Sequence, residues 1–400
     1  MDHLLTDTQR AWQIKAREFA ETEIAPRSLA RDQIAAPADT FDWELIRKGS
    51  QLGIRTAAVP REYGGHGIDF TTQALMIVEM ARADSAMAKT FSQSWKWSHL
   101  IVDHGSSEQK KRYFDAFVAD DEFVMGGGIT EPNAGSDNRF PPPDDPKAGL
   151  QLSAKLDGDT WVLNGSKCYI ANANIGKLIF AFARTDPHAP VHEGTTIFAV
   201  QNEPRGAAGL KVGKVFNKHG WRFYQNAELF FDNVRVADSD RLSAINGTHK
   251  NHGGKNSKFG DLEYAANALG ICEAAIEMAT TQGRTHQQSG KRLNEHQMFQ
   301  LKLSEMHMQT EALRSFVMRV AAESDSTANI SRKHNPLLMN FSTDSMQRVC
   351  YLNLDIHRAA AKRTKGEINA RADKLVRDAI IWTHIAGDSV QRMKAVQALL

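Results

Sequence analysis

The sequence predicts an α+β protein whose chain runs from helices into a β-sheet and back into helices. Hydrophobic residues follow helical spacing over about the first 125 residues, alternate with polar residues from about residue 126, and return to helical spacing beyond Lys258. The strand-like runs are joined by short connections, which favours an antiparallel sheet or barrel over βαβ units.

The helical N-terminal region begins with a predicted capping box from Thr6 to Gln9. Hydrophobic residues at helical spacing follow it: Trp12, Ala16, Phe19 and Ile24. Pro26 interrupts the pattern, which resumes over 45–52 and 74–83. Between these two segments, a glycine-rich stretch predicts a turn where the backbone passes closely.

The middle region begins with hydrophobic residues at every second position: Leu150, Leu152, Ala154 and Leu156. Residues 157–159 then predict a turn, and Trp161 and Leu163 resume the alternation, so the two runs predict a hairpin. Further strand-like runs follow at 178–182, 196–200 and 229–236. The segment 246–258 is rich in Gly, Asn, His and Lys and predicts a mobile loop before the last helical region.

The composition argues against several classes of partner. Forty-nine basic and 47 acidic residues give a net charge of +2, so neither nucleic acid nor a membrane surface is expected as a partner. The N-terminus lacks the features of a signal peptide, and no apolar stretch is long enough to span a bilayer. Cys168, Cys272 and Cys350 lack a metal-binding spacing, so we expect buried thiols, no metal site and a cytoplasmic location.

The stretch Thr130–Asp137 carries the most informative motif. Its Thr, Ser and Asp side chains are short and polar, and Gly135 allows backbone N–H groups to turn toward one point. Such a loop can bind a phosphate or the polar edge of a ring. On composition alone, a simple β-turn is the stronger interpretation.

Further motifs accompany this loop along the chain: Val-Pro-x-x-Tyr-Gly-Gly at 59–65, Gly-Ser-x-Glu-Gln-Lys at 105–110, Asn-Gly-x-Lys-x-Tyr-Ile at 164–170, Phe-Asp-x-Val-x-Val at 231–236 and Arg-Asp-Ala at 377–379. Together with Thr130–Asp137 they resemble the motifs of the acyl-CoA dehydrogenases, in the same order and over almost the whole chain. The protein is therefore identified as a member of that family.

The resemblance implies an N-terminal helical domain over 1–125, a middle antiparallel β-domain over 126–242 and a C-terminal four-helix bundle over 243–400. It also implies a homodimer or homotetramer, with FAD between the β-domain and the bundle. In such enzymes a carboxylate removes the α-proton of an acyl thioester while the flavin takes the β-hydride. The thioester is carried by CoA or by a carrier protein.

The resemblance also assigns cofactor-binding positions: Ile129, Thr130, Gly135, Ser136, Tyr169, Ala171, Arg284, Gln297 and Gly387. Thr130 would hydrogen-bond the pyrimidine edge of the flavin, and Ser136 would face the pyrophosphate or the pantetheine arm of the ligand. Tyr169 would stack on the ring in place of the tryptophan common in the family. Arg284 and Gln297 would reach an FAD across the subunit interface, with a solvated helix face as the alternative.

Several positions depart from the family's pattern. Ala171 stands where a threonine usually donates a hydrogen bond near the flavin. Ala386 stands where the usual base precedes Gly387, and a methyl group abstracts no proton. Some members place the base at the start of the first bundle helix, but that position is Gly260 here, followed by Asp261 in place of an arginine.

Glu263 is the candidate catalytic base, because it lies three residues after Gly260 and hence close to one helical turn away. A buried glutamate at this place is suited to proton transfer. The alternatives are that Glu263 is a surface or salt-bridged residue, or that Asp388 is the base.

The region after Arg284 departs from the pattern as well. The family's Arg-x-x-Phe reads Arg-Thr-His-Gln at 284–287, and about two extra residues precede Glu295. The Gly-Gly-x-Gly expected ahead of Arg377 is missing. These losses weaken the expectation of standard FAD binding across a dimer.

Four residues are expected to contact the substrate: Lys96, His99, Ser136 and Asp261. Residues 95–99 fall where the family lines its acyl pocket, although a helix with one exposed charge is an equal alternative. An inward-pointing Lys96 would suit a carboxylate or another anionic substituent on the substrate.

The predicted function is a flavin-dependent oxidoreductase that carries out α,β-dehydrogenation of an unusual acyl thioester, or a related elimination without net oxidation. One alternative is a flavin-dependent monooxygenase on the same fold, for which Ala171 and Asp261 would leave an open pocket. The other is a catalytically eroded subunit of a hetero-oligomer, which the altered flavin contacts would explain.

Overall fold

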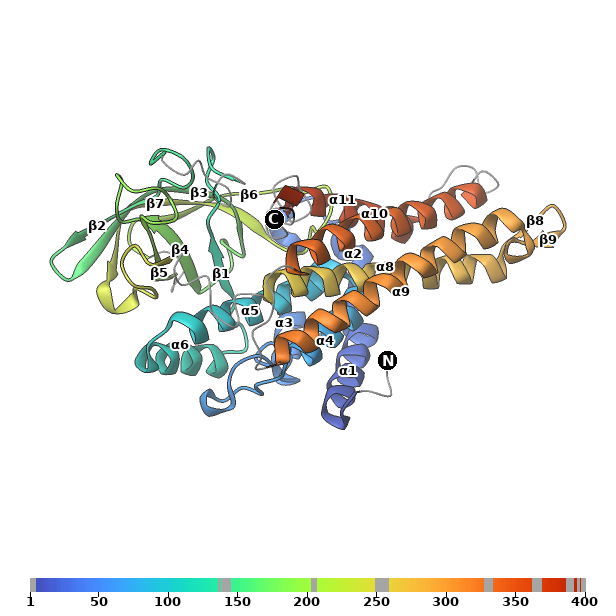
Figure 1. Ribbon diagram of the computed structural model, residues 1–400, viewed down its shortest axis with the longest axis horizontal. Coiled ribbons are helices and arrows are strands. Elements are labelled where there is room, and N and C mark those ends of the chain that lie inside the picture. Colours follow the sequence, from blue (N-terminus) through green and yellow to red (C-terminus); the bar gives the residue numbers. More distant parts are fainter. Residues whose placement is uncertain are drawn as a thin grey trace.

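The computed structural model has the predicted order of helices, sheet and helices (Figure 1). It describes residues 5–135, 138, 145–202, 207–248, 259–326, 334–361, 369–385, 392–393 and 396. The α+β fold class is confirmed by this order. Most of the predicted mobile loop 246–258 lies outside the described residues.

Helices make up the N-terminal region: α1 (Asp7–Phe19), α2 (Ala25–Asp32), α3 (Trp43–Gln51), α4 (Phe70–Ala83), α5 (Ser85–His104) and α6 (Ser107–Ala119). The predicted capping box is confirmed, because the side chains of Thr6 and Gln9 each accept a hydrogen bond from the other's backbone N–H. The prediction that Pro26 interrupts the helical pattern is wrong, because the chain stays helical through this residue. A π-helical turn, Ala20–Ile24, leads directly into α2, whose first turn tolerates a proline because N–H groups there need no intrahelical partner.

Seven described strands form one sheet: β1 (Met125–Gly128), β2 (Ser153–Asp157), β3 (Thr160–Ala171), β4 (Leu178–Arg184), β5 (Thr195–Gln201), β6 (Leu210–Val215) and β7 (Asn226–Ala237). Their order is β1-β4-β2-β3-β7-β6, with β5 paired to β4. Most pairs are antiparallel, as predicted. β1 instead runs parallel to β4, with Met125 opposite Leu178, and the intervening β2 and β3 supply the long connection that a parallel pair needs.

The predicted hairpin is confirmed, since β2 and β3 are antiparallel and Asp157 faces Thr160 across the turn. Gly158 in this turn has a φ of +66°, which favours glycine. The sequence pattern does not predict two of the strands. β1 is Met-Gly-Gly-Gly and has no alternating side chains, while β6 is mostly exposed, so burial imposes no pattern on it.

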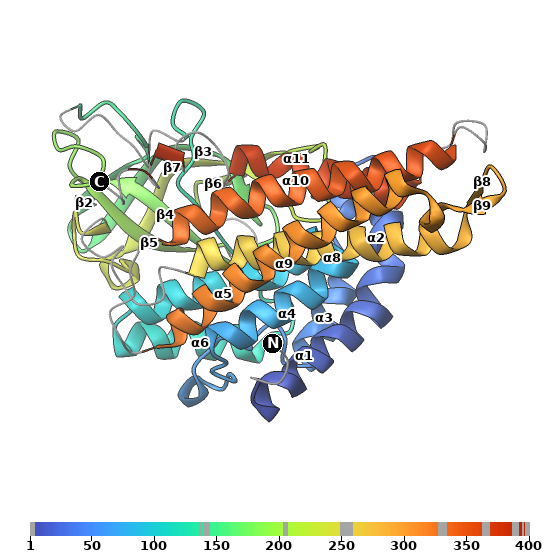
Figure 2. The same cartoon turned by 45° about the vertical axis from the view of Figure 1, so that its right-hand side comes forward.

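The C-terminal region contains a bundle of helices: α8 (Phe259–Thr285), α9 (Gln297–Asp325), α10 (His334–Ala361) and α11 (Ala370–Ile385). Figure 2 shows α8, α9 and α10 side by side, with α11 next to α10. A small hairpin of β8 (Gln287–Gln288) and β9 (Lys291–Arg292) joins α8 to α9 and accounts for the extra residues after Arg284. None of the described helices combines the length and the apolarity needed to cross a membrane.

The N-terminal helices and the bundle share one hydrophobic core. Its buried residues include Phe19 from α1, Ile77 from α4, Leu269 from α8 and Met346 from α10. The sheet has a separate core of its own. The connection between β6 and β7 leaves the sheet and buries Trp221 in the helical core. This connection therefore joins the sheet to the helices.

Candidate active site

The loop that begins at Thr130 is fixed by a buried ion pair behind it. Lys167 Nζ on β3 lies 2.7 Å from Glu131 Oε1 and also donates to the carbonyl oxygen of Ile129, at 3.0 Å. The Glu131 carboxylate accepts two backbone N–H groups, from Gln151 at 2.6 Å and from Leu152 at 2.8 Å. Burial lowers the pKa of Lys167 to about 8, and the charge of Glu131 opposes this shift. Glu131 and Lys167 therefore set the position of the loop. Both residues lie within the motifs described above, but the motifs alone do not show that the two side chains pair.

Tyr169 presents its ring beside this loop. The N–H of Cys168 donates to the carbonyl oxygen of Thr130 at 3.1 Å, so the loop lies alongside β3 next to Tyr169. A β-bulge follows Lys167, and Tyr169 has a φ of +55°, which together turn this residue out of the regular strand. Its ring stacks on Phe216 with centroids 4.1 Å apart, yet Tyr169 remains 59% exposed.

The backbone of Tyr169 is strained. A tyrosine in a left-handed conformation costs roughly 1–3 kcal/mol, and such strain is typical of functional sites. Ile129, Thr130 and Ala171 are partly buried. Gly135 is exposed, and a methyl group built on it would meet nothing within 4 Å. Ser136 lies outside the described residues.

Glu263 lies on α8 and is completely buried. Its Oε2 is 2.6 Å from the Nζ of Lys89 on α5, which is also completely buried. Its Oε1 accepts a hydrogen bond from the hydroxyl of Ser92, at 2.5 Å. The Lys89 ammonium also lies over the Tyr264 ring, 4.2 Å from its centroid. Burial lowers the pKa of Lys89, and the charge of Glu263 opposes that shift. The salt-bridged alternative for Glu263 is thus what the structure shows.

The other proposed substrate contacts lie on the same two helices. The His99 ring is buried between Phe70 and Phe259, and its Nε2 lies 2.9 Å from Gln73 Oε1. Burial lowers the pKa of His99 to about 3, so this histidine is neutral. Lys96 is partly buried with its Nζ 5.5 Å from the Trp97 ring centroid, and Asp261 is partly buried in the first turn of α8.

Polar residues of α5 face α8 along what we call the α5–α8 seam: Ser85, Lys89, Ser92 and His99 on α5, and Phe259, Glu263 and Asn267 on α8. The α5 members recur at helical spacing and therefore share one face. Asn267 Nδ2 donates to the carbonyl oxygen of Ser85 at 2.9 Å, and the ring centroids of His99 and Phe259 are 4.9 Å apart. The helices run antiparallel along this seam, with Glu263 in its middle.

The β6–β7 connection links Tyr169 to the seam. Asn226 Nδ2 donates to the carbonyl oxygen of Tyr169 at 2.8 Å, and Asn226 Oδ1 lies 2.6 Å from Lys218 Nζ. Lys218 also donates to the carbonyl oxygen of Tyr224. The pKa of Tyr224 is raised well above its ordinary value, mainly by burial and further by nearby groups that include Glu263. Hydrogen bonds thus connect the backbone of Tyr169 to that of Tyr224 through Asn226 and Lys218.

Comparisons with known proteins agree with this geometry. Three family models match the chain: "Acyl-CoA dehydrogenase, N-terminal domain" over residues 6–121, the middle domain over 126–234 and the C-terminal domain over 259–400. The short-chain-specific acyl-CoA dehydrogenase of Megasphaera elsdenii is 32% identical over 335 residues, which cover 81% of each chain. The chain belongs to the acyl-CoA dehydrogenase family.

Further relatives support this membership. The glutaryl-CoA dehydrogenase of Desulfococcus multivorans is 31% identical over 81% of this chain and 80% of its own length. The solved butyryl-CoA dehydrogenase of Megasphaera elsdenii has a TM-score of 0.88 and 29% identity, and the match covers all of both chains. The protein is therefore a flavin-dependent oxidoreductase of the acyl-CoA dehydrogenase family, a family whose members use FAD.

The two positions predicted to reach an FAD across a subunit interface are on the surface. Arg284 is exposed near the end of α8, and Gln297 is exposed as the first residue of α9, on either side of the β8–β9 hairpin. Their exposure leaves both side chains accessible to a second copy of the chain. Gly387 and Asp388 lie outside the described residues.

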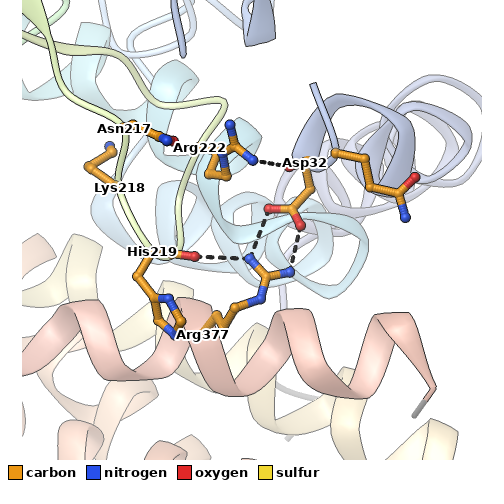
Figure 3. Close-up of a pocket in the computed structure, with 7 residues that line it drawn as sticks. Asp32, Asn217, Lys218, His219, Arg222 and Arg377 are labelled. Atoms are coloured by element: carbon orange, nitrogen blue, oxygen red, sulfur yellow. Dashed lines mark hydrogen bonds and ion pairs between the residues drawn. The ribbon is translucent and has the colours of Figure 1, made fainter. Parts of the chain in front are cut away.

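A pocket of about 560 Å³ opens where α2, α11 and the β6–β7 connection meet (Figure 3). Its lining residues are Asp32, Gln33, Asn217, Lys218, His219, Arg222 and Arg377. Arg377 from the Arg-Asp-Ala motif pairs with Asp32, at 2.6 Å, and donates to the carbonyl oxygen of His219. Arg222 donates to the carbonyl oxygens of Asp32 and Ala35. These cations are already engaged within the protein, so the pocket holds the three regions together.

Proposed function

We propose that the protein is an FAD-dependent dehydrogenase of an acyl thioester, with Glu263 as the base that accepts the α-proton. The observation that carries this proposal is the placement of Glu263: a fully buried carboxylate in the α5–α8 seam, held by Lys89 and Ser92 about one helical turn from Gly260. A methyl group built on Gly260 would meet nothing within 4 Å, which leaves space about one helical turn from Glu263.

The chemistry divides between the cofactor and the chain. FAD, when bound, supplies the hydride acceptor. Glu263 would accept the proton from the α-carbon, and Ser92 would orient its carboxylate through the hydrogen bond to Oε1. The closed α5–α8 seam would exclude water and so prevent competing protonation of the substrate. Among the family's usual hydrogen-bond donors, the threonine replaced by Ala171 is missing, so this chain would rely on Thr130.

The cofactor would be held by residues from both ends of the site. Tyr169 would stack on the ring, and Ile129, Thr130, Gly135, Ser136 and Ala171 would line its edge. Arg284, Gln297 and Gly387 would complete the site, the first two from a neighbouring subunit of a homodimer or homotetramer. The exposure of Arg284 and Gln297 supports this arrangement.

The substrate would be a polar acyl group on CoA or a carrier protein. Lys96, His99, Ser136 and Asp261 remain the proposed substrate contacts, and the polar character of the α5–α8 seam supports an unusual acyl group. A cytoplasmic location is also proposed. It is supported by Cys168, Cys272 and Cys350, which are all buried free thiols.

The test begins with the absorption spectrum of the purified protein and the identity of the flavin released on denaturation. Acyl-CoA and acyl-carrier thioesters are then mixed with the protein anaerobically, and bleaching of the flavin is followed. We expect bound FAD that one of these thioesters bleaches. Glu263→Gln should slow bleaching by about 10²–10⁴-fold, because general-base catalysis contributes that much. Glu273→Gln is the matched control, a partly buried carboxylate on the same helix that pairs with Arg314.

Other results point to other functions. A colourless protein that regains activity with a related chain would indicate an eroded subunit. Reduced flavin that consumes oxygen and hydroxylates a substrate would indicate the monooxygenase. Product formation without bleaching would indicate elimination without net oxidation. Circular dichroism and the flavin content of Glu263→Gln show whether a loss of activity reflects unfolding.

A further inference from the structure

A lysine is buried in the α5–α8 seam with one charged partner. Among the described residues, Glu263 is the ion-pair partner of Lys89, and the exposed fraction of both side chains is zero. The Tyr264 ring lies on Lys89 as well, and its face attracts the ammonium. Lys89 is therefore held between a carboxylate on α8 and the aromatic ring of the next residue.

Such a pair is not explained by stability. Removing two charges from water costs several kcal/mol per ion, and hydrophobic residues of similar volume are often equally stable or more so. The pair lies away from water, since its two side chains and those of Leu262, Ala265 and Ala266 on α8 are all fully buried. A charged pair kept in this environment therefore points to a role other than packing.

We propose that Lys89 is a positioning residue for the proton transfer: its ammonium pairs with the Glu263 carboxylate and holds it in place. This inference rests on the proposed function of Glu263. The titratable groups near Glu263 are Lys89 from α5, Tyr264 as the next residue on α8 and Tyr224 from the β6–β7 connection. Of these groups Lys89 is the cation, so it supplies the positive charge beside the buried carboxylate.

The proton balance follows from this arrangement. The α-carbon–hydrogen bond of the acyl thioester breaks, its proton passes to a carboxylate oxygen of Glu263, and its electron pair stays with the substrate to form the new double bond. FAD, when bound, would supply the acceptor for the hydride from the β-carbon, so the substrate would lose two electrons. Lys89 gains and loses no proton in the step and acts only through its charge.

The test compares the pH dependence of anaerobic flavin bleaching in three proteins: wild type, Lys89→Met and Lys89→Arg. Removing the ammonium leaves the buried carboxylate without its positive partner, and burial favours the protonated form of an unpaired carboxylate. The acid side of the Lys89→Met rate profile should therefore move to higher pH by about one unit or more, which lowers the rate about tenfold at pH values below the wild-type midpoint. The rate should recover as the pH rises. Lys89→Arg keeps the charge and should keep the wild-type profile.

A second measurement does not depend on catalysis. In Lys89→Met the unpaired Glu263 is buried, and its ionisation opposes folding, so the midpoint of chemical unfolding should fall as the pH is raised from 5 to 9. The double variant Lys89→Met/Glu263→Gln has neither charge and should lack this fall. If Lys89→Met instead lowers the bleaching rate by one factor at every pH, or leaves it unchanged, the positioning role is wrong. If the wild type is not bleached by any thioester, or Glu263→Gln is as active as the wild type, it is the proposed function that fails.

Discussion

Gly270 on α8 packs directly against the backbone of Val78 on α4. A methyl group built on Gly270 would lie 2.5 Å from the carbonyl oxygen of Val78 and 2.7 Å from the Cβ of Ala81. Both distances are below ordinary van der Waals contact. The close approach of α4 and α8 in the shared core therefore depends on a glycine at this position.

We expect Gly270→Ala to lower the free energy of unfolding by about 1–3 kcal/mol, because a buried methyl group there forces two helix backbones apart. Chemical unfolding followed by tryptophan fluorescence measures this change. Gly260→Ala is the matched control on the same helix. A methyl group at Gly260 meets nothing within 4 Å, and alanine favours helix, so its stability should be unchanged or slightly raised. Equal effects of the two substitutions would contradict the packing argument.

We expect Tyr169→Ala to weaken FAD binding by about tenfold, because stacking of an aromatic side chain on a flat ring contributes about 1–3 kcal/mol. Tyr169→Phe keeps the ring and should bind FAD like the wild type. Fluorescence titration of the flavin-free protein measures both. Tyr351→Ala, which removes another exposed tyrosine from α10, serves as the control. Unchanged affinity in Tyr169→Ala would place the flavin elsewhere.

His99 should make the protein less stable in acid. Its pKa is about 3 in the folded protein, against about 6.5 in an unfolded chain. Between these values the unfolded chain binds a proton that the folded one does not, so this contribution is complete above pH 6.5 and is lost as the pH falls toward 3. Lowering the pH from 7 to 5 should remove about 2 kcal/mol.

Unfolding curves at pH 7 and pH 5 for the wild type and His99→Gln isolate this contribution. The variant should lose about 2 kcal/mol less than the wild type over that interval, since glutamine does not titrate. The same loss in both proteins would mean that His99 is protonated in the folded state.

The sequence predicts local features better than pairings between distant residues. The capping box at Thr6 and the hairpin turn at Asp157 depend on residues close in the chain, and both are confirmed. Pro26 was expected to interrupt the helix. The π-helical turn before it cannot be predicted from spacing, because it changes the helical period itself.

The same difference between local features and pairings of distant residues is found at the candidate site. Short motifs point to Thr130 and Tyr169 as candidate cofactor-binding residues, because each lies in a stretch that resembles a motif of the family. Glu131 and Lys167 are 36 residues apart in the chain, and Ser92 and Glu263 are 171 apart, so only the fold reveals that they meet. The buried partner of Glu263 had no local signal, since a lysine within a helix ordinarily indicates a solvent-exposed face.

The shared core of the N-terminal helices and the bundle has a consequence for synthesis of the chain on the ribosome. Residues of α4 and α5 leave the ribosome long before α8, which begins at Phe259 and covers them. At about 5–20 residues per second, the interval is on the order of ten seconds or more. During that time the face of α4 that packs on α8 lacks that helix, so the nascent N-terminal region exposes apolar surface that a chaperone can bind until the last helices arrive.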